Sequence, residues 1–189
     1  NSVTVSAINA EVAWDVTTGS ASMVVAVLDT GVRFDHPDLS GKLLDGYDFV
    51  GADRNDSGVT IFPNTFESSK DGNGVDPNAS DEGDGITLAE TTNPNSLFYH
   101  CTSQDDTGQY LEERSSWHGT QVSGLIGALT NNGTGMASVG RNVRVLPVRV
   151  LSKCGGWDSD ITAGMLWAAG IAVPGADPNP TPAKVLNLS

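Results

Sequence analysis

The sequence predicts an α/β fold in which a central, mostly parallel β-sheet is flanked by helices. Two observations carry this prediction. An uninterrupted apolar run rich in β-branched residues, such as Met23–Leu28, is typical of a strand that is buried on both faces. Runs of this kind alternate along the chain with stretches of helical periodicity, and that alternation favours a parallel sheet. The 189 residues suffice for one domain with a single core.

The first expected elements are a short helix and a buried strand. Ala10–Val16 contains Ala and Trp and is followed by Gly19, a residue type that commonly ends helices. Met23–Leu28 is the expected strand, and it ends at Asp29-Thr30-Gly31. The segment 51–116 keeps no helical or strand period, so we expect a long loop there.

The second half of the chain alternates helices and strands. We expect a helix over Gly119–Leu129, a strand over Val143–Leu151, a helix over Ile161–Ala169 capped from within residues 158–160, and another buried strand over Lys184–Ser189. The expected core-facing positions of the two helices are Val122, Leu125, Ile126 and Leu129 in the first and Ile161, Met165, Leu166 and Ala169 in the second.

Composition and charge exclude several classes of protein. Acidic residues outnumber basic ones by 23 to 10, for a net charge of −13, which argues against nucleic acid as a partner and favours cations. No stretch approaches the ~18 consecutive apolar residues of a membrane-spanning helix. The 38% of hydrophobic residues is too high for a disordered chain. The first residues lack the pattern of a signal peptide, so we expect any leader to have been removed.

The segment 51–116 is unusually acidic. Ten acidic residues and no Lys or Arg lie between Asp71 and Glu113. A loop of this length is functional, pinned to the fold, or simply a solvated surface, and the sequence leaves these alternatives open. Asp and Asn alternate with glycines over 71–76, a pattern typical of calcium loops although the spacing does not complete an EF-hand. The candidate calcium ligands here are Asp71, Asn73, Asp76, Asp81 and Asp84.

The chain has only two cysteines, Cys101 and Cys154. Two cysteines in an acidic, loop-rich chain favour one disulfide in an exported protein. The alternative is a pair of unrelated buried thiols in a cytosolic protein.

Two polar residues stand where ligands bind in parallel sheets. Asp29 ends the first strand, and ligands of open parallel sheets lie at the carboxyl ends of their strands. His118 precedes Gly119-Thr120 at the start of the next predicted helix. Either residue alone is as readily a turn or surface residue, but the two arrangements together are rare.

These residues resemble two motifs of the subtilisin-like serine peptidases, the subtilases. The segment 27–32 (VLDTGV), followed by 36–39 (HPDL), is similar to their aspartate motif, and 118–124 (HGTQVSG) is similar to their histidine motif. The resemblance implies a three-layer subtilisin-like fold. It also implies that residues 1–189 are the N-terminal part of a subtilase catalytic domain, with the acidic loop as an insertion at about 51–116.

The resemblance implies a serine endopeptidase that hydrolyses proteins and acts outside the cell. Asp29 becomes the carboxylate that orients the imidazole, and His118 becomes the general base that takes a proton from a serine hydroxyl. A nucleophile motif of the Gly-Thr-Ser-Met-Ala type does not occur in the sequence. We therefore expect the nucleophile to lie beyond this chain, which alone would be inactive and would pair with the C-terminal remainder of its domain.

The resemblance also implies substrate and calcium sites. Gly155 and Gly156 match a glycine-bearing edge strand that pairs with substrate backbone, although an ordinary Gly-Gly turn is an equal alternative. Ser189 matches a substrate-binding position. The segment 129–136 is similar to a calcium loop, against the alternative of a simple Asn-Gly turn. Its implied ligands are the carbonyls of Leu129, Thr134 and Met136, the Asn132 side chain and the Asp38 carboxylate.

Two other functions compete with this interpretation. Asp-Thr-Gly also marks aspartic peptidases, which need a second such motif to form a pair of carboxylates. The only candidate, Asp56-Ser57-Gly58, follows no strand, and an α/β pattern disagrees with the all-β fold of that class. The second rival is an inactive, peptidase-like calcium-binding module, which the missing serine favours and the intact Asp29 and His118 disfavour.

Overall fold

The computed structural model describes residues 8–55, 57–58, 60 and 64–189. Within this part of the chain, four strands form one sheet in the order β2-β3-β1-β4. They are β1 (Val24–Asp29), β2 (Tyr47–Asp48), β3 (Arg144–Arg149) and β4 (Val185–Leu188). All three pairings between these strands are parallel, which confirms the predicted fold class.

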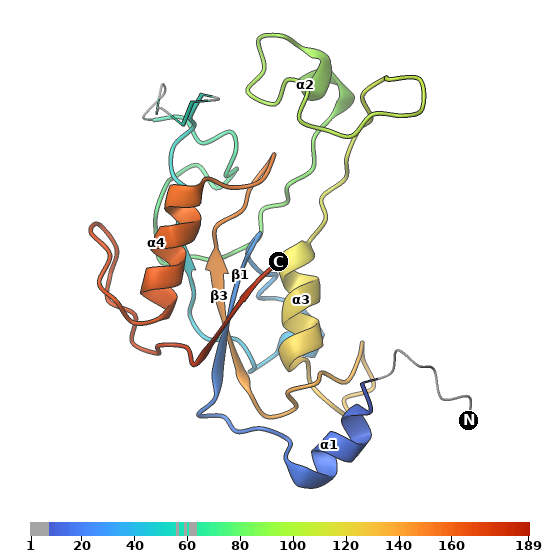
Figure 1. Ribbon diagram of the computed structural model, residues 1–189, viewed down its shortest axis with the longest axis vertical. Coiled ribbons are helices and arrows are strands. Elements are labelled where there is room, and N and C mark those ends of the chain that lie inside the picture. Colours follow the sequence, from blue (N-terminus) through green and yellow to red (C-terminus); the bar gives the residue numbers. More distant parts are fainter. Residues whose placement is uncertain (1–7, 56, 59, 61–63) are drawn as a thin grey trace.

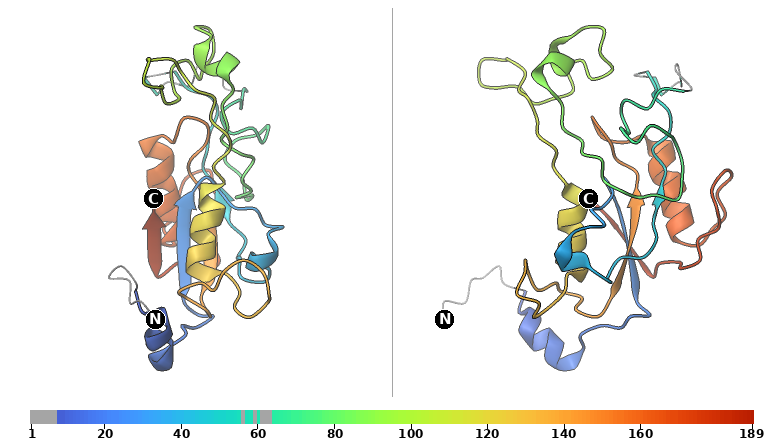
Figure 2. Two further views of the ribbon diagram at one scale, coloured as in Figure 1. Left: turned by 90° about the vertical axis from the view of Figure 1, so that its right-hand side faces the viewer. Right: turned by 180° about the vertical axis from the view of Figure 1, so that it is seen from behind.

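Helices cover both faces of this sheet. Those described are α1 (Ala10–Val16), α2 (Leu88–Thr92), α3 (His118–Gly127) and α4 (Asp158–Ala168), with a short 3-10 helix at Pro37–Leu39. Figures 1 and 2 show α3 and α4 on opposite sides of β1 and β3. None of the described helices is long and apolar enough to cross a membrane. The arrangement is the expected three layers of helix, sheet and helix.

Alternate residues of the strands pack against different helices. Gly127 of α3 packs against Val145, whereas Gly164 of α4 packs against Val148 and Leu28. Because neighbouring side chains of a strand point to opposite faces, the odd and even positions of β3 meet different helices. The face under α4 carries the larger core, in which Trp167 packs against Tyr47 and Phe49.

The core-facing sides predicted for α3 and α4 are largely wrong. Small or polar residues are buried instead: Gly119, Thr120, Ser123 and Gly127 in α3, with Asp160, Gly164, Trp167 and Ala168 in α4. A Cβ on Gly127 would lie 2.6 Å from Val145, so α3 lies too close to the sheet for long side chains between them. The predicted Leu125, Met165 and Leu166 are 56%, 38% and 40% exposed.

Two further expectations need correction. The residues expected to cap α4 lie inside it, because its N-cap is Trp157 with no side-chain cap, and Asp160 instead forms an ion pair with Arg54 at 2.7 Å. Strand β4 forms as predicted but is not buried, since Val185 is 49% exposed and Leu188 is 48% exposed. It pairs with β1 and is the outermost of the described strands of this chain.

The acidic segment extends beyond the carboxyl ends of β1 and β3 (Figure 1). Its distal part is fastened by the predicted disulfide between Cys101 and Cys154, with Cα atoms 5.7 Å apart. Lys153, next to that disulfide, forms an ion pair with Glu90 at 2.5 Å. The Glu90 carboxylate also caps α2 through Thr87. Of the three alternatives left open, these contacts favour a segment that is pinned to the fold.

A buried arginine holds the proximal part of the same segment. Arg149 ends β3, and its guanidinium lies 2.6 Å from Asp48 and 2.8 Å from Asp71, both of which are buried or nearly so. It also donates to the carbonyl of Ser69. Burial raises the pKa of Asp48 to about 8, although Arg149 opposes the shift. The cluster ties residues 69–71 to the end of β3, beside Asp29 in the sheet register.

Candidate active site

Asp29 and His118 lie together, as the motifs predicted. The Nδ1 atom of His118 lies 2.9 Å and 2.8 Å from the two carboxylate oxygens of Asp29. The Asp29 side chain is 1% exposed and that of His118 is 46% exposed. An ionised carboxylate only accepts hydrogen bonds, so Nδ1 carries the proton and Nε2 keeps a lone pair. The pair therefore presents a basic nitrogen, fixed from behind by a buried anion.

The chain reaches this geometry through two abrupt changes of direction. Asp29 is the last residue of β1, and its Oδ1 accepts the N–H of Thr30 at 2.7 Å. Trp117 has a left-handed backbone (φ 51°), which is uncommon for a bulky side chain, and α3 begins directly after it. His118 is thus the first residue of its helix.

A close backbone contact brings α3 to the end of β1. A Cβ on Gly119 would lie 2.1 Å from the carbonyl oxygen of Gly31 and 3.1 Å from the Cβ of Asp29. Only glycine lets the helix start approach the Asp-Thr-Gly turn this closely. The two glycines lie 88 positions apart, and no local pattern around either indicates that they touch each other.

A cavity of about 340 Å³ opens beside His118, lined in part by the disulfide and by Gly155. Asp84 and Glu113 bring carboxylates to its wall. Of the substrate-binding residues expected, Gly155 therefore lines the same cavity as His118. Ser189 follows Leu188, which pairs with Leu28, so it lies at the same edge of the sheet as Asp29.

The backbone of Gly155 forms a turn and not a free strand edge. Its N–H donates to the carbonyl of Ser152 at 3.1 Å, and its carbonyl accepts the N–H of Ser152 at 2.8 Å. Gly156 follows with so little room that a Cβ would lie 2.3 Å from the carbonyl oxygen of Val150. Both backbone groups of Gly155 engage Ser152, which is the hydrogen bonding of a turn, and substrate binding by Gly155 and Gly156 stays a prediction.

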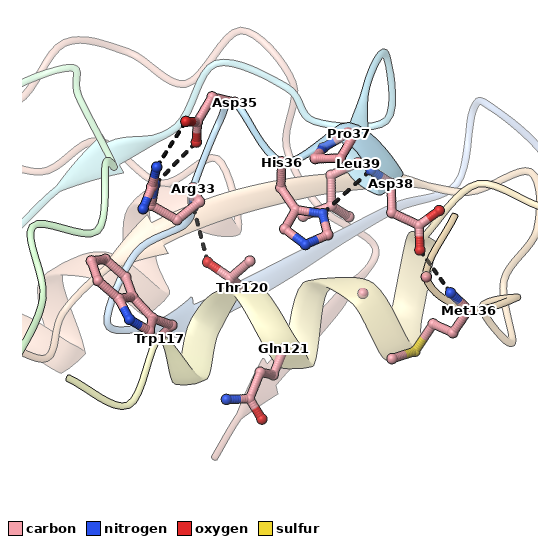
Figure 3. Close-up of a pocket in the computed structure, with 12 residues that line it drawn as sticks. Arg33, Asp35, His36, Pro37, Asp38, Leu39, Trp117, Thr120, Gln121 and Met136 are labelled. Carbon is pink, nitrogen blue, oxygen red and sulfur yellow. Dashed lines mark hydrogen bonds and ion pairs between the residues drawn. The ribbon is translucent and has the colours of Figure 1, made fainter. Parts of the chain in front are cut away.

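The expected calcium loop wraps around Asp38. This carboxylate is 3% exposed and accepts the Asn132 side-chain amide at 2.8 Å and the Met136 N–H at 2.9 Å. The N–H of Leu129 donates to the Asp38 carbonyl at 2.8 Å, and Thr134 donates to the Asn132 side chain at 3.1 Å. Figure 3 shows Asp38 and Met136 at one end of a cavity of about 500 Å³ beside α3. All five expected ligand residues are therefore neighbours.

The five candidates in the acidic segment do not form one ligand set. Asp71 pairs with Arg149, and Asp76 accepts the side-chain amide of Asn73 at 2.6 Å. Asp84 instead accepts both N–H and hydroxyl of Ser116, and Asp81 turns to Thr30. Burial raises the pKa of Asp81, against its hydrogen bonds. Among the described residues, no three acidic, cysteine or histidine side chains gather as they would around a metal.

Comparisons with known proteins agree with this geometry. The model of the family described as the subtilase family matches residues 20–189. The chain belongs to the subtilase family. The same match excludes the aspartic-peptidase interpretation, whose candidate Asp56 lies outside the described residues.

Two curated relatives and one solved structure are similar along nearly the whole chain. The extracellular basic protease of Dichelobacter nodosus is 40% identical over 187 residues, which cover 96% of this chain and 26% of that protein. The extracellular protease of Xanthomonas campestris pv. campestris is 41% identical over 182 residues, again 96% of this chain and 26% of that protein. A solved structure titled as proteases from Pseudoalteromonas arctica PAMC 21717 is 40% identical, with a TM-score of 0.72 over 94% of this chain and 43% of that one. The subtilase chain thus spans about a quarter of the length of these curated relatives.

Proposed function

We propose that this subtilase chain is the N-terminal part, residues 1–189, of the catalytic domain of a serine endopeptidase. The observation that carries the proposal is the contact between His118 Nδ1 and the buried carboxylate of Asp29, with the far edge of the imidazole exposed. A serine hydroxyl is a poor nucleophile until a base removes its proton, and His118 is placed to do so. The serine would come from sequence beyond this chain.

The proposed reaction follows from the pair. The Nε2 atom of His118 takes the serine proton as the serine oxygen attacks the peptide carbonyl, and it returns that proton to the leaving amine. Water then repeats the sequence on the acyl-enzyme. Asp29 holds the productive tautomer and stabilises the imidazolium that forms in each half-reaction. Without the serine, the 1–189 chain would bind its own C-terminal remainder but hydrolyse nothing.

Proteins outside the cell are the proposed substrates. Both curated relatives above carry names that call them extracellular proteases. The disulfide between Cys101 and Cys154 supports the same location, because disulfides persist in oxidising surroundings. The cavity beside His118 is the proposed substrate path, and the carboxylates of Asp84 and Glu113 on its wall would give it a negative potential.

Calcium is the proposed cofactor, and the loop around Asp38 is the place that suits it. Asp38 is a buried carboxylate, and a Cβ on Gly135 would lie 2.1 Å from its Oδ2, so the loop lies close around that oxygen. The two carboxylate oxygens accept N–H groups of Asn132 and Met136, and calcium would take the place of those hydrogen bonds. Calcium prefers such oxygen donors from carboxylates, amides and backbone carbonyls, and would neutralise the buried charge. Asp38, the Asn132 side chain and the carbonyls of Leu129, Thr134 and Met136 would hold it. The dispersed acidic segment does not suit a single ion.

The test uses the longer protein that carries this chain, with a protein substrate. His118→Ala should lower kcat by about 10⁶-fold, the size found in subtilisin itself, while the fold melts as before. His100→Asn is the control, because His100 lies in the acidic segment, stacked between Tyr99 and Tyr110. A fluorophosphonate that labels activated serines should react with the unaltered protein and with His100→Asn, and should not react with His118→Ala. Near-normal turnover in His118→Ala would refute the assignment, and a parent that neither turns over nor reacts would show an inactive module.

A further inference from the structure

Asp81 is buried at the active site although it belongs to the acidic segment. It is 5% exposed. Its Oδ2 accepts the hydroxyl of Thr30 at 2.7 Å, and its Oδ1 accepts the N–H of Gly83 at 2.8 Å. Both carboxylate oxygens therefore have a partner within the protein. The sequence pattern alone had suggested a calcium ligand at this position.

The backbone fixes Asp81 in this place. Its N–H donates to the carbonyl of Val32 at 3.1 Å, and the N–H of Val32 donates to the carbonyl of Ala79 at 3.0 Å. Gly31 makes room for the crossing, because a Cβ there would lie 2.7 Å from the Ala79 carbonyl oxygen. Residues 79–81 thus lie along the Asp-Thr-Gly turn, so the carboxylate reaches Thr30 from a held position.

Thr30 connects Asp81 to the helix that carries His118. Its Oγ1 donates to Asp81 and at the same time accepts the N–H of Gly119 at 3.1 Å. The N–H groups of a first helical turn have no partner within the helix, so this amide needs an outside acceptor. A hydroxyl has one proton to donate. Because Asp81 takes that proton, a lone pair of Oγ1 is left facing Gly119.

The two ends of this connection are the neighbours of the catalytic pair. Thr30 directly follows Asp29, and Gly119 directly follows His118. The Asp81–Thr30–Gly119 contacts therefore run beside the contact between His118 and Asp29 and join the same two segments. A displacement of the start of α3 would strain both the Gly119 contact with Thr30 and the His118 contact with Asp29.

We propose that Asp81 is a positioning residue for the Asp29–His118 pair: it fixes the hydroxyl proton of Thr30, and Thr30 in turn holds the first turn of α3. This inference rests on the proposed function. It gives the acidic segment a role in catalysis, because the segment supplies the acceptor on which the helix start depends. The competing interpretation is that Asp81 only anchors the segment.

The two interpretations differ in what they change. An anchor alone affects the unfolding temperature and leaves the chemistry of the folded enzyme intact. A positioning residue lowers kcat at unchanged KM, because small displacements of a catalytic group are costly. It also alters His118 itself, in the resonance of the Nδ1 proton.

The kinetic experiment is a double-mutant cycle in the longer protein. Asp81→Asn and Thr30→Val each keep the shape of the side chain and should each lower kcat about 10- to 100-fold with KM unchanged. The double variant should be no slower than Thr30→Val alone, since both changes break one connection. Thr30→Ser restores the hydroxyl and should recover most of the rate lost in Thr30→Val. Asp105→Asn is the matched control, because Asp105 is an exposed carboxylate of the same segment that bonds only within its own turn.

Proton NMR provides a reading that needs no turnover. In the same longer protein, Asp81→Asn and Thr30→Val should shift the Nδ1 proton of His118 and speed hydrogen exchange at the Gly119 amide, and Asp105→Asn should change neither. If the parent fails to cleave protein, the proposed function falls while NMR still decides the positioning role. If the unaltered protein cleaves its substrate, two kinetic results overturn this inference. One is a wild-type kcat for Asp81→Asn, and the other is a double variant whose loss in kcat is the product of the losses in the two single variants. Unchanged His118 and Gly119 signals overturn it as well.

Discussion

Gly119→Ala is the substitution for which the structure gives the sharpest expectation. The added Cβ would lie 2.1 Å from the carbonyl oxygen of Gly31, whereas ordinary van der Waals contact begins at 3.4 Å. The obstacle is backbone that is itself held by residues 79–81, so it cannot turn away as a side chain would. The start of α3 must therefore move by about 1.3 Å, the difference between 3.4 Å and 2.1 Å. His118, the preceding residue, must move with it.

The expected magnitudes follow from that displacement. Forcing a methyl group into a filled site costs about 1–3 kcal/mol in the free energy of unfolding, and an unyielding backbone neighbour places this case near the upper end. Replacing a helical glycine by alanine raises the free energy of unfolding by up to about 1 kcal/mol, because alanine has the higher helix propensity. We therefore expect a net loss of roughly 2 kcal/mol. A 1 Å misplacement of a catalytic group costs about 10²-fold in kcat.

The assay compares two glycines of one helix in the longer protein. Gly124, also in α3, has no neighbour within 4 Å of an added Cβ. Gly124→Ala should therefore stabilise the protein by about 0.5–1 kcal/mol and leave kcat unchanged. Urea unfolding and steady-state kinetics on both variants separate helix propensity from steric conflict. Equal stabilisation by the two substitutions, or wild-type kcat for Gly119→Ala, would refute the argument from the Gly31 contact.

Two further predictions concern calcium and pH. Removing calcium with a chelator should lower the unfolding temperature and open 129–136 to proteolysis, because an ion that binds only the folded state stabilises it by about 2.7 kcal/mol at 100 times its Kd. The substitution Asp38→Asn should abolish this effect of calcium, whereas Asp76→Asn should leave it unchanged. An unfolding temperature that is the same with and without calcium would contradict the site. Burial of Glu90 opposes its ionisation, but hydrogen bonds from Lys153 and Thr87 outweigh burial and lower its pKa from 4.5 to about 2. Since the folded pKa is depressed, the carboxylate stabilises the fold above pH 4.5, and this contribution should disappear as the pH falls from 4.5 to 2. Urea unfolding across that range should show a shallower pH slope for Glu90→Gln than for the parent, and parallel slopes would count against the ion pair.

The sequence by itself determined the features that depend on neighbouring residues. Met23–Leu28 predicted a buried strand because a continuous apolar, β-branched run suits few other structures, and it forms as β1, Val24–Asp29. Asp29 and His118 were found because each stands at the end or start of an element, where its motif is contiguous. The pairing of Cys101 with Cys154 could also be predicted from the sequence, since the chain has no other cysteine.

Only the tertiary structure decided which surfaces meet. Apolar spacing placed Leu125 and Met165 toward the core, but α3 and α4 approach the sheet through small residues, and the spacing of large side chains does not encode that approach. Strand β4 was expected to be buried from its composition. Within residues 1–189 it is the outermost of the described strands, and which elements pack against it is decided by tertiary structure that no local pattern contains.

The acidic segment shows the same limit at the level of single side chains. Asp71, Asp81 and Asp84 look alike in the sequence, yet their partners are Arg149, Thr30 and Ser116, which lie 78, 51 and 32 positions away. A carboxylate accepts from whichever donor the chain brings to it, so its role is set by where distant segments cross. The residue type of Asp81 predicted an oxygen ligand. Its burial beside Thr30 made it a neighbour of Asp29 and His118, because residues 79–81 pair with the backbone of Val32 and bring the Asp81 carboxylate within 2.7 Å of the Thr30 hydroxyl.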